Sequence, residues 1–422
     1  MQITLSAKTA SGSVRAISSK SAAHRLLICS AFADKPTLIR CEETNEDIIA
    51  TVDCLCALGA KITRKPPFFE VSPIEEFNST ALLPCNESGS TLRFILPICA
   101  ALGGEFTFDM KGELPNRPLS PLKELLEANG IEFAINNDGR LVIKGKLCGN
   151  HYKIAGNISS QFISGMLFAL TVSKRSATLA ITTKLESAPY VDITINALST
   201  FGVKIEKSTD HYQIPKLQKL SAPKEVSVEG DWSNAAFPLC LGVIGKNPIT
   251  VSNISFDSYQ GDKKIVEILK KFGGRIEQNG SSFTAYPSKL RAIELDASDI
   301  PDLVPIIATI ASVADGKTVI SGAARLKIKE SNRLVAISNV LSTLGADIVP
   351  TDDGLIINGK ESLIGGEVSS FGDHRIAMCA AIASAVSKNE VTVNKAEAVN
   401  KSYPLFWDDL RSLGAKITEQ NI

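Results

Sequence analysis

The sequence predicts an α/β protein of two domains, because one structural unit recurs six times along its 422 residues. The pentapeptide LGAKI stands at 58–62 and again at 413–417, and four related segments lie between these copies. Their glycines follow one another at intervals of 71, 72, 71, 72 and 69 residues: Gly59, Gly130, Gly202, Gly273, Gly345 and Gly414. A nearly constant period of this length is typical of a repeated supersecondary unit.

The first element of each unit is an amphipathic run that ends at the repeat glycine, as in DIIATVDCLCALG and PLKELLEANG. Glycine at this place predicts the C-terminal end of a helix, where the backbone adopts a positive φ. The alternating residues that follow, such as IEFAI, predict a strand. Each repeat glycine is therefore expected to join an amphipathic helix to a strand.

A second helix is predicted about half a period away from each glycine. Serine and aspartate are frequent helix N-caps, and one of them recurs there in every unit: Ser19, Ser88, Ser159, Asp231, Asp302 and Asp373. Each opens a segment that is apolar nearly all round, such as LVPIIATIASVA at 303–314, which is typical of a buried helix. The unit is then βαβαββ. Six such units exceed one core, so we expect two domains of three units. An open solenoid, which would leave the apolar helices less covered, is the alternative.

The composition limits the classes of partner and compartment. Lysine plus arginine total 45, as do aspartate plus glutamate, so no net field attracts nucleic acid or a membrane surface. The apolar stretch at 303–314 is too short to span a bilayer, and the N-terminus lacks a signal core. Nine scattered cysteines indicate reduced thiols in a cytoplasmic protein. The CLC at 54–56 has no second ligand pair, so we expect no metal or cofactor.

Charged and hydroxyl side chains gather at the beginnings of the predicted buried helices, in SSKSAAHR, NESGSTLR, NISSQF and FGDHR. A helix N-terminus favours an anion by about 0.3–1 kcal/mol, and serines, glycines and cations there suit phosphate or carboxylate. Each motif alone is explained by capping or by a solvated helix start. Their sixfold coincidence predicts a site for several anions if the helix starts converge.

Ten motifs in chain order resemble the 5-enolpyruvylshikimate-3-phosphate synthase (3-phosphoshikimate 1-carboxyvinyltransferase) family across essentially the whole chain. They are SKSAAHR (19–25), SGSTLR (88–93), NRP (116–118), SSQF (159–162), SAPYVDIT (187–194), EGDWSNAAF (229–237), IPDLVP (300–305), KIKESNR (327–333), FGDHRIAM (371–378) and NKSYPLFW (400–407). The resemblance implies two inside-out α/β barrels of three βαβαββ repeats each. The first domain would hold 1–13 and 229–422, the second 14–228, and the active site would lie in the cleft between them.

The resemblance also implies a reaction, in which the enolpyruvyl group of phosphoenolpyruvate moves to the 5-hydroxyl of shikimate 3-phosphate. Phosphate leaves by addition and elimination, in the pathway to chorismate and the aromatic amino acids. Asp302 resembles the proton acceptor at the hydroxyl and Glu330 the proton donor to C3; the catalytic set also includes Lys329, Lys20 and His374. Since nearby cations favour a carboxylate, we expect Glu330 to be desolvated when the cleft closes, or to share a proton with Lys329.

The same motifs imply the binding residues. For shikimate 3-phosphate they are Lys20, Ser21, Arg25, Ser159, Ser160, Gln161, Ser187, Tyr190, Asp302 and Lys329. For phosphoenolpyruvate they are Lys20, Gly89, Arg117, Gln161, Arg333, Arg375 and Lys401. Arg93 is expected to support this second set. The chain departs from the pattern at Glu87, where many relatives have Asn, and at Phe94, where relatives often have Pro.

Two other functions are compatible with parts of the pattern. A UDP-N-acetylglucosamine enolpyruvyl transferase is built on the same repeats, but it usually carries a loop cysteine where this chain has GELPNRPLS. A non-catalytic anion-binding repeat scaffold would need no pair of Asp302 and Glu330. We expect the shikimate-type enzyme, acting as a monomer on two small-molecule substrates, with no nucleic acid or membrane partner.

Overall fold

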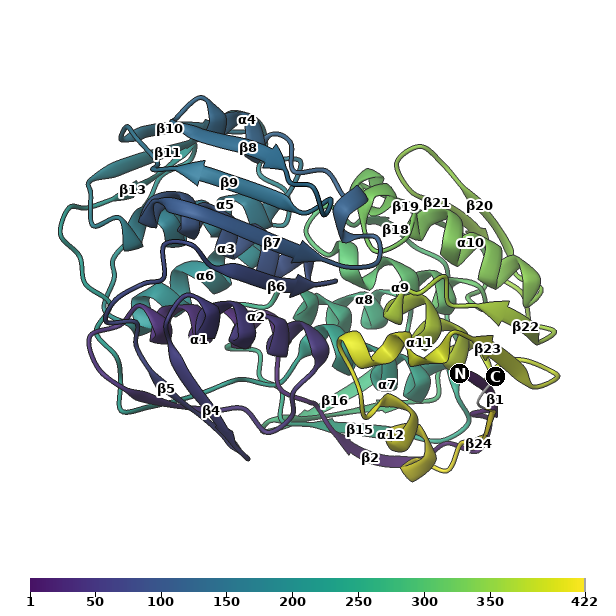
Figure 1. Cartoon of the computed structure of the whole chain (residues 1–422). Coiled ribbons are helices and arrows are strands. Elements are labelled where there is room, and N and C mark those ends of the chain that lie inside the picture. Colours follow the sequence, from purple (N-terminus) through teal and green to yellow (C-terminus); the bar gives the residue numbers. More distant parts are fainter. Residues whose placement is uncertain (421–422) are drawn as a thin grey trace. The chain divides into compact units, whose positions relative to one another are not determined.

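The structure is a computed structural model that describes residues 1–420, and these residues fold into two compact units (Figure 1). Unit 1 contains Met1–Ile17 and the chain from Glu229 onward, and unit 2 is Ser18–Val228. The chain therefore passes into unit 2 after Ile17 and returns to unit 1 at Glu229. No helix of the described residues is long and apolar enough to cross a bilayer.

Both predicted helices are present in each of the six repeats. The apolar helices are α1 (Lys20–Ala31), α3 (Gly89–Leu102), α5 (Ser160–Val172), α7 (Trp232–Ile244), α9 (Val304–Ala311) and α11 (His374–Ala383). The amphipathic helices are α2 (Glu46–Ala57), α4 (Leu122–Glu127), α6 (Ala188–Thr200), α8 (Ile265–Lys271), α10 (Arg333–Thr343) and α12 (Phe406–Ser412). Short 3₁₀ helices are η1 (Leu114–Asn116), η2 (Gly261–Lys264), η3 (Pro301–Leu303), η4 (Ala324–Ile328) and η5 (Ala396–Lys401).

The predicted helix ends are confirmed at the repeat glycines, and the predicted helix starts at five of six positions. All six glycines follow an amphipathic helix with a φ between 78° and 118°. The side chains of five predicted caps accept a backbone N–H of the helix that follows: Ser19, Ser88, Ser159, Asp231 and Asp373. The prediction is wrong for Asp302, which lies inside η3. Pro301 begins that turn, and Leu303 precedes α9 without a side-chain cap.

Each repeat is associated with one four-stranded mixed sheet, and three of these sheets are continuous in sequence. Their orders are β6-β7-β9-β8, β10-β11-β13-β12 and β18-β19-β21-β20. The strands are β6 (Leu82–Asn86), β7 (Gly104–Met110), β8 (Ile131–Ile135), β9 (Leu141–Gly145), β10 (His151–Ile154), β11 (Ala177–Ile181), β12 (Glu206–Lys207), β13 (His211–Ile214), β18 (Glu294–Asp296), β19 (Lys317–Ser321), β20 (Asp347–Pro350) and β21 (Leu355–Asn358). In each sheet the first pair is parallel and the others are antiparallel, as the βαβαββ unit predicts.

The other three sheets take one strand from a distant part of the chain. Their orders are β14-β3-β5-β4, β16-β17-β15-β2 and β22-β23-β1-β24. The strands are β1 (Gln2–Ser6), β2 (Gly12–Arg15), β3 (Thr37–Arg40), β4 (Lys61–Lys65), β5 (Phe68–Ser72), β14 (Glu225–Ser227), β15 (Ile249–Ser252), β16 (Arg275–Asn279), β17 (Ser282–Tyr286), β22 (Gly366–Ser369), β23 (Val391–Asn394) and β24 (Lys416–Gln420). β2 pairs with β15 in unit 1, and β14 pairs with β3 in unit 2. The chain thus leaves unit 1 directly after β2 and leaves unit 2 directly after β14, and each of these strands pairs within the unit that the chain is leaving.

The apolar helices form the interior of each unit. In unit 1, α7, α9 and α11 pack against one another, and in unit 2 α3 packs along α5 (Figure 1). Gly165 allows the close approach of α5, because a Cβ there would overlap the backbone carbonyl of Arg93. The sheets cover the outer faces of these helices. The charged side chains of the apolar helices lie mainly at their polar N-terminal ends.

Candidate functional site

The predicted site residues form one group in each unit. Unit 2 contains Lys20, Ser21, Arg25, Gly89, Arg117, Ser159, Ser160, Gln161, Ser187 and Tyr190. Unit 1 contains Asp302, Lys329, Glu330, Arg333, His374, Arg375 and Lys401. Most of them lie at the beginning of a helix, where backbone N–H groups have no partner within the helix.

Arg25 is the central buried cation of the group in unit 2. Its side chain is 2% exposed, and it donates from Nε to Thr194 Oγ1 at 2.7 Å and from Nη2 to the carbonyl oxygen of Tyr190 at 2.9 Å. Nη1 donates to the carbonyl oxygen of Ser21 at 2.6 Å. Burial lowers the pKa of Arg25 to about 9, which still leaves the guanidinium charged at neutral pH. Its partners in the described chain are neutral oxygens, so the site has a buried positive charge that suits an anion.

Lys20 is the first residue of α1 and is held by a carboxylate. Its Nζ lies 2.8 Å from Oδ2 of Asp47, which is itself buried at the beginning of α2. Asn45 caps α2 by accepting the N–H of Ile48 at 3.0 Å, so the helix start fixes the place of the carboxylate. The pair positions the Lys20 ammonium beside the capped start of α1.

The beginning of α3 brings two arginines to one glycine. A Cβ on Gly89 would lie 2.6 Å from Nη1 of Arg93 and 2.6 Å from Nη1 of Arg117. Arg93 donates to the carbonyl oxygens of Gly89 and Pro118, each at 3.3 Å, and its guanidinium lies 5.6 Å from the ring centre of Phe162. A side chain at this position would displace both guanidinium groups.

The beginnings of α5 and α6 add hydroxyl and amide groups. Gln161 donates from Nε2 to Ser90 Oγ at 2.9 Å, which links α5 to α3. Ser159 caps α5, and Ser160 is buried as its first residue. Ser187 precedes α6 in the left-handed conformation with a φ of 54°, a strained geometry for a residue with a Cβ that is often retained at functional sites.

A buried chain of hydrogen bonds that the sequence did not reveal anchors the start of α3. His24 Nδ1 lies 2.7 Å from Thr51 Oγ1, and Thr51 Oγ1 lies 2.6 Å from Thr91 Oγ1. Thr91 then donates to Ser88 Oγ at 2.7 Å. Burial lowers the pKa of His24 to about 3, so the imidazole is neutral and acts as a structural hydrogen-bonding group at neutral pH.

Asp302 lies among cations in unit 1. Arg333 donates to its Oδ1 at 2.9 Å, and Arg375 donates to its Oδ2 at 3.0 Å and to its carbonyl oxygen at 3.1 Å. Nζ of Lys329 is 3.9 Å from Oδ1. Burial opposes ionisation, but the charges of Arg375, Lys329 and Arg333 hold the pKa of Asp302 well below its usual range. The cations, rather than a helix start, keep this carboxylate ionised.

Arg333 joins three carboxylates at the start of α10. Besides Asp302, it donates from Nε to Asp373 Oδ2 at 2.7 Å and from Nη2 to Glu330 Oε2 at 2.8 Å. Despite burial, Asp373, Glu330 and Asp302 raise the pKa of Arg333 above its usual value. The structure therefore pairs Glu330 with Arg333, while proton sharing between Glu330 and Lys329 stays a prediction.

Lys329 has a lowered affinity for its proton. Burial lowers its pKa to about 8, with Asp302 opposing the shift and Arg333 adding to it. A lysine near this value changes charge close to physiological pH, which is typical of a functional ammonium. Lys329 follows η4 directly, in extended backbone.

The start of α11 supplies the remaining predicted residues of unit 1. Asp373 caps the helix by accepting the N–H of Arg375 at 3.0 Å and also accepts from Ser331 at 3.1 Å. Nδ1 of His374 is 3.8 Å from Asp373 Oδ1, and both side chains are buried. Lys401, at the end of η5, is also buried.

Asp262 is a buried acid of unit 1 that sequence reasoning missed. Burial and then the charge of Asp302 raise its pKa to about 6, although Arg375 opposes the shift. Ser233 donates a hydrogen bond to Asp262 Oδ2. A sequence signal existed: Asp262 precedes its repeat glycine by 11 residues, and Asp47 precedes Gly59 by 12. Asp47 lies in the first turn of α2, and Asp262 lies in η2, directly before α8.

The structure shows which side chains surround the two departures from the family pattern, Phe94 and Glu87. Phe94 is buried in α3, with Arg25 4.9 Å above its ring and Phe168 5.8 Å away in an edge-on contact. The Phe94 ring thus stabilises the Arg25 guanidinium by a cation–π contact. The carboxylate of Glu87 lies against Gly112, where a Cβ would overlap Oε1 of Glu87.

Each group contains cations that suit anionic ligands, and the group in unit 1 also holds the ionised carboxylate of Asp302. Within residues 1–420, no set of three or more His, Cys, Asp or Glu side chains is arranged to hold a metal ion.

Two enzymes compared by sequence and one solved structure match the chain over nearly its whole length. It is 41% identical to a 3-phosphoshikimate 1-carboxyvinyltransferase of Clostridium kluyveri over 414 residues, with 97% of each chain covered. It is 40% identical to the same enzyme of Clostridioides difficile, with 98% of this chain and 97% of the relative covered. EPSP synthase of Acinetobacter baumannii superposes with a TM-score of 0.80 at 24% identity, covering 99% of this chain and all of that one.

A more distant enzyme has the same fold. The enolpyruvyl transferase NikO of Streptomyces tendae superposes with a TM-score of 0.80 at 18% identity, covering 100% of this chain and 99% of that one. These structures confirm the predicted fold class of two inside-out α/β barrels. The family model described as EPSP synthase (3-phosphoshikimate 1-carboxyvinyltransferase) matches residues 6–410. The chain therefore belongs to the EPSP synthase family.

Proposed function

We infer that the protein transfers the enolpyruvyl group of phosphoenolpyruvate to the 5-hydroxyl of shikimate 3-phosphate and releases phosphate. Family membership over residues 6–410 supports this reaction, and it distinguishes the shikimate-type enzyme from the UDP-N-acetylglucosamine transferase and the non-catalytic scaffold. The observation that carries the assignment at the site is the carboxylate of Asp302, held ionised by Arg375, Lys329 and Arg333.

We propose that Asp302 accepts the proton of the attacking hydroxyl. An ionised carboxylate in hydrogen-bonding reach of an alcohol can act as a general base. Glu330 then protonates C3 of phosphoenolpyruvate, so that C2 becomes electrophilic and forms the new C–O bond. In the elimination step both transfers reverse: the Glu330 carboxylate takes a proton from C3 as the C–O bond to phosphate breaks, and Asp302 gives its proton to the leaving phosphate. Lys20, Lys329 and His374 complete the proposed catalytic set.

We propose that the group in unit 2 binds most of shikimate 3-phosphate. The proposed ligands are Lys20, Ser21, Arg25, Ser159, Ser160, Gln161, Ser187 and Tyr190, with Asp302 and Lys329 from unit 1. Arg25 supports this assignment because it is a buried cation whose partners are neutral oxygens. The phosphate or carboxylate of the substrate would supply the missing negative charge.

Phosphoenolpyruvate is assigned to a second set of residues. The proposed ligands are Lys20, Gly89, Arg117, Gln161, Arg333, Arg375 and Lys401. The two guanidinium groups beside Gly89 support this assignment, since they suit one anionic group close to the backbone. The proposal thus gives residues of both units a part in one reaction.

The reaction is tested by measuring phosphate release from phosphoenolpyruvate with three acceptors: shikimate 3-phosphate, UDP-N-acetylglucosamine and none. We expect release with shikimate 3-phosphate alone. Release with the nucleotide sugar would favour the other transferase. The absence of release in all three mixtures, with both ligands still binding, would favour the scaffold.

We further propose that the enzyme acts as a monomer in the cytoplasm. Support for the compartment comes from its nine cysteines, all of which are unpaired thiols in the described chain, as suits a reducing compartment. Light scattering of the purified protein tests the first part, since a mass near 90 kDa, about twice 45.1 kDa, would show a dimer.

A further inference from the structure

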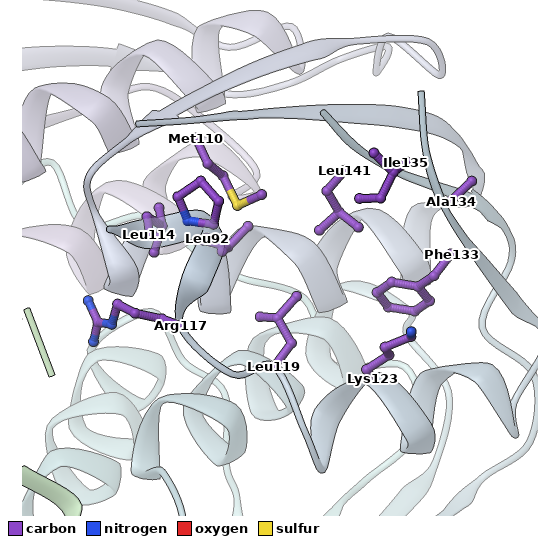
Figure 2. A pocket seen from close by; sticks show the side chains of 11 residues that line it. Leu92, Met110, Leu114, Arg117, Leu119, Lys123, Phe133, Ala134, Ile135 and Leu141 are labelled. Carbon is purple, nitrogen blue, oxygen red and sulfur yellow. The ribbon is translucent and has the colours of Figure 1, made fainter. Parts of the chain in front are cut away.

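Unit 2 contains a partly open pocket of about 300 Å³, and Arg117 is the only one of its lining residues to which the proposed reaction gives a part (Figure 2). Eleven side chains line it, from α3, the end of β7, the segment of η1 and α4, and strands β8 and β9. The volume is within the range of small-molecule sites. Apolar residues make most of the wall, with Phe133, Leu119 and Leu141 around the open space in Figure 2.

The pocket lies beside the short amphipathic helix of this repeat. α4 has six residues, against 12 in α2 and 13 in α6. Six helical residues span about 9 Å, whereas the five residues of β8 span about 17 Å. The end of the sheet therefore lacks a helical cover, and Ile135 at the end of β8 is 66% exposed.

Two cations flank this apolar wall. Lys123 and Arg117 line the pocket and lie on either side of Leu119 in the view of Figure 2. Nζ of Lys123 lies 5.8 Å from the ring centre of Phe133 and 3.7 Å from Glu127 Oε1. None of the eleven lining residues, all in the described chain, is acidic. An apolar wall with positive ends is complementary to a small apolar molecule that carries a carboxylate.

We propose that this pocket is a second ligand site, which binds a small carboxylic acid with an apolar body. The carboxylate pairs with Lys123, and the body lies against Leu119, Leu141 and Phe133. The far end of the ligand contacts the side chain of Arg117, whose guanidinium points away from Leu119 in Figure 2 and lies beside Gly89.

Occupancy of the pocket has a consequence at Arg117. The proposed function assigns this arginine to phosphoenolpyruvate, and the following step rests on that assignment. A ligand that shifts the Arg117 side chain changes the affinity for phosphoenolpyruvate. By thermodynamic linkage, phosphoenolpyruvate changes the affinity for the pocket ligand by the same factor. The site would thus regulate the enzyme.

The test is calorimetric titration with 4-phenylbutyrate and with its uncharged analogue 4-phenylbutanamide. We expect the carboxylate to bind the unmodified protein more tightly than the amide. Lys123→Gln should weaken phenylbutyrate about threefold, the size of one exposed ion pair, and leave the amide unchanged. Ile135→Glu, at an exposed position, should weaken phenylbutyrate further by placing a like charge at the pocket.

Two control variants keep the test specific. Lys144→Gln removes an exposed charge of β9 that does not line the pocket, and Val349→Glu adds a carboxylate at an exposed residue of the corresponding strand β20. Neither should change phenylbutyrate binding. The site is overturned if phenylbutyrate does not bind, or if the Lys123→Gln and Ile135→Glu variants bind it as tightly as the unmodified protein does.

The regulatory step is measured separately by repeating the titration with phosphoenolpyruvate present. A changed affinity for phenylbutyrate supports coupling through Arg117, and an unchanged affinity overturns it. Because the titration without phosphoenolpyruvate measures no catalysis, loss of the pocket site and loss of the proposed function are distinguishable.

Discussion

Arg375 binds Asp302 twice, from Nη2 to the carboxylate at 3.0 Å and from Nη1 to the backbone carbonyl at 3.1 Å. The side chain and the main chain of one residue are thus fixed by one guanidinium. A carboxylate held in this way keeps its charge and its orientation, both of which a general base requires, while the same cations lower its basicity.

Replacing Asp302 should lower the rate of catalysis without weakening substrate binding. Asp302→Asn retains an oxygen for Arg375 but cannot accept the hydroxyl proton. We expect kcat to fall about 10²- to 10⁴-fold, the usual contribution of a general base, with nearly intact affinity for shikimate 3-phosphate. Steady-state kinetics and direct titration measure the two quantities. Collapse of substrate binding would show that Asp302 is structural instead.

The pKa of Lys329 predicts an alkaline limit of activity. Its value of about 8 means that the ammonium loses its charge as the pH rises through 8, so kcat/KM should fall above that pH. Lys329→Arg remains charged at every accessible pH. We expect this variant to be slower but to lose the decline near pH 8. An identical alkaline limb in both enzymes would exclude Lys329 as its origin.

Asp262 should make the folded protein less stable at neutral pH. Its pKa rises from 3.8 to about 6, so the folded state holds the proton more tightly than the unfolded state. Stability therefore falls as the pH rises from about 4 to 6, and the cost is fully present above pH 6. Asp262→Asn should raise the free energy of unfolding at pH 7.5 by up to about 3 kcal/mol.

Urea unfolding at two pH values checks this sign. At pH 5 the gain from Asp262→Asn should be smaller than at pH 7.5, because part of Asp262 is already protonated. Asp352→Asn, which changes a fully exposed acid, should alter stability little at either pH. A gain that is equal at both values contradicts the assigned pKa.

Gly89 predicts a selective effect on one substrate. In Gly89→Ala the new Cβ would lie 2.6 Å from a nitrogen of Arg93 and of Arg117, so both guanidinium groups must move. We expect KM for phosphoenolpyruvate to rise about tenfold, or about 1.4 kcal/mol, with little change in the affinity for shikimate 3-phosphate. An equal loss for both substrates would point to general damage of unit 2.

Arg25 predicts the converse selectivity. Arg25→Met keeps much of the contact with Phe94 but removes the buried charge. Since hydrogen bonds to charged groups contribute about 1.5–3 kcal/mol each, affinity for shikimate 3-phosphate should fall at least about 100-fold. Arg140→Met, which removes a more exposed arginine of the same unit, is the control. Titration calorimetry should show normal affinity in that variant.

The parts of the fold that depend on local sequence could be predicted. The repeat glycines are an example, because positive φ after a helix is a local requirement that Gly59 and its counterparts meet. The prediction failed at Asp302, where Pro301 begins a separate 3₁₀ turn and moves the aspartate inside it. The pairing of β2 with β15 and of β14 with β3 is contained in no local pattern, since each strand pairs with one far away in sequence. Only the family resemblance placed 1–13 with 229–422.

The charged residues of the site were predictable where a helix start marked them, as at Lys20 and Arg375. Their partners were not. Asp47 and Asp262 have the sequence appearance of ordinary acidic helix starts, and only the packing of neighbouring helices shows that both are buried. The aromatic support of Arg25 by Phe94 likewise depends on the packing of α1 against α3, which no local pattern contains.

The most direct measurement follows phosphorus by NMR while the protein acts on phosphoenolpyruvate and shikimate 3-phosphate together. Enolpyruvyl transfer should replace the phosphoenolpyruvate signal by an equal amount of inorganic phosphate, and the phosphate of the shikimate ester should stay covalently bound in a new compound. Unchanged spectra, or phosphate released at the same rate without the shikimate ester, would contradict enolpyruvyl transfer.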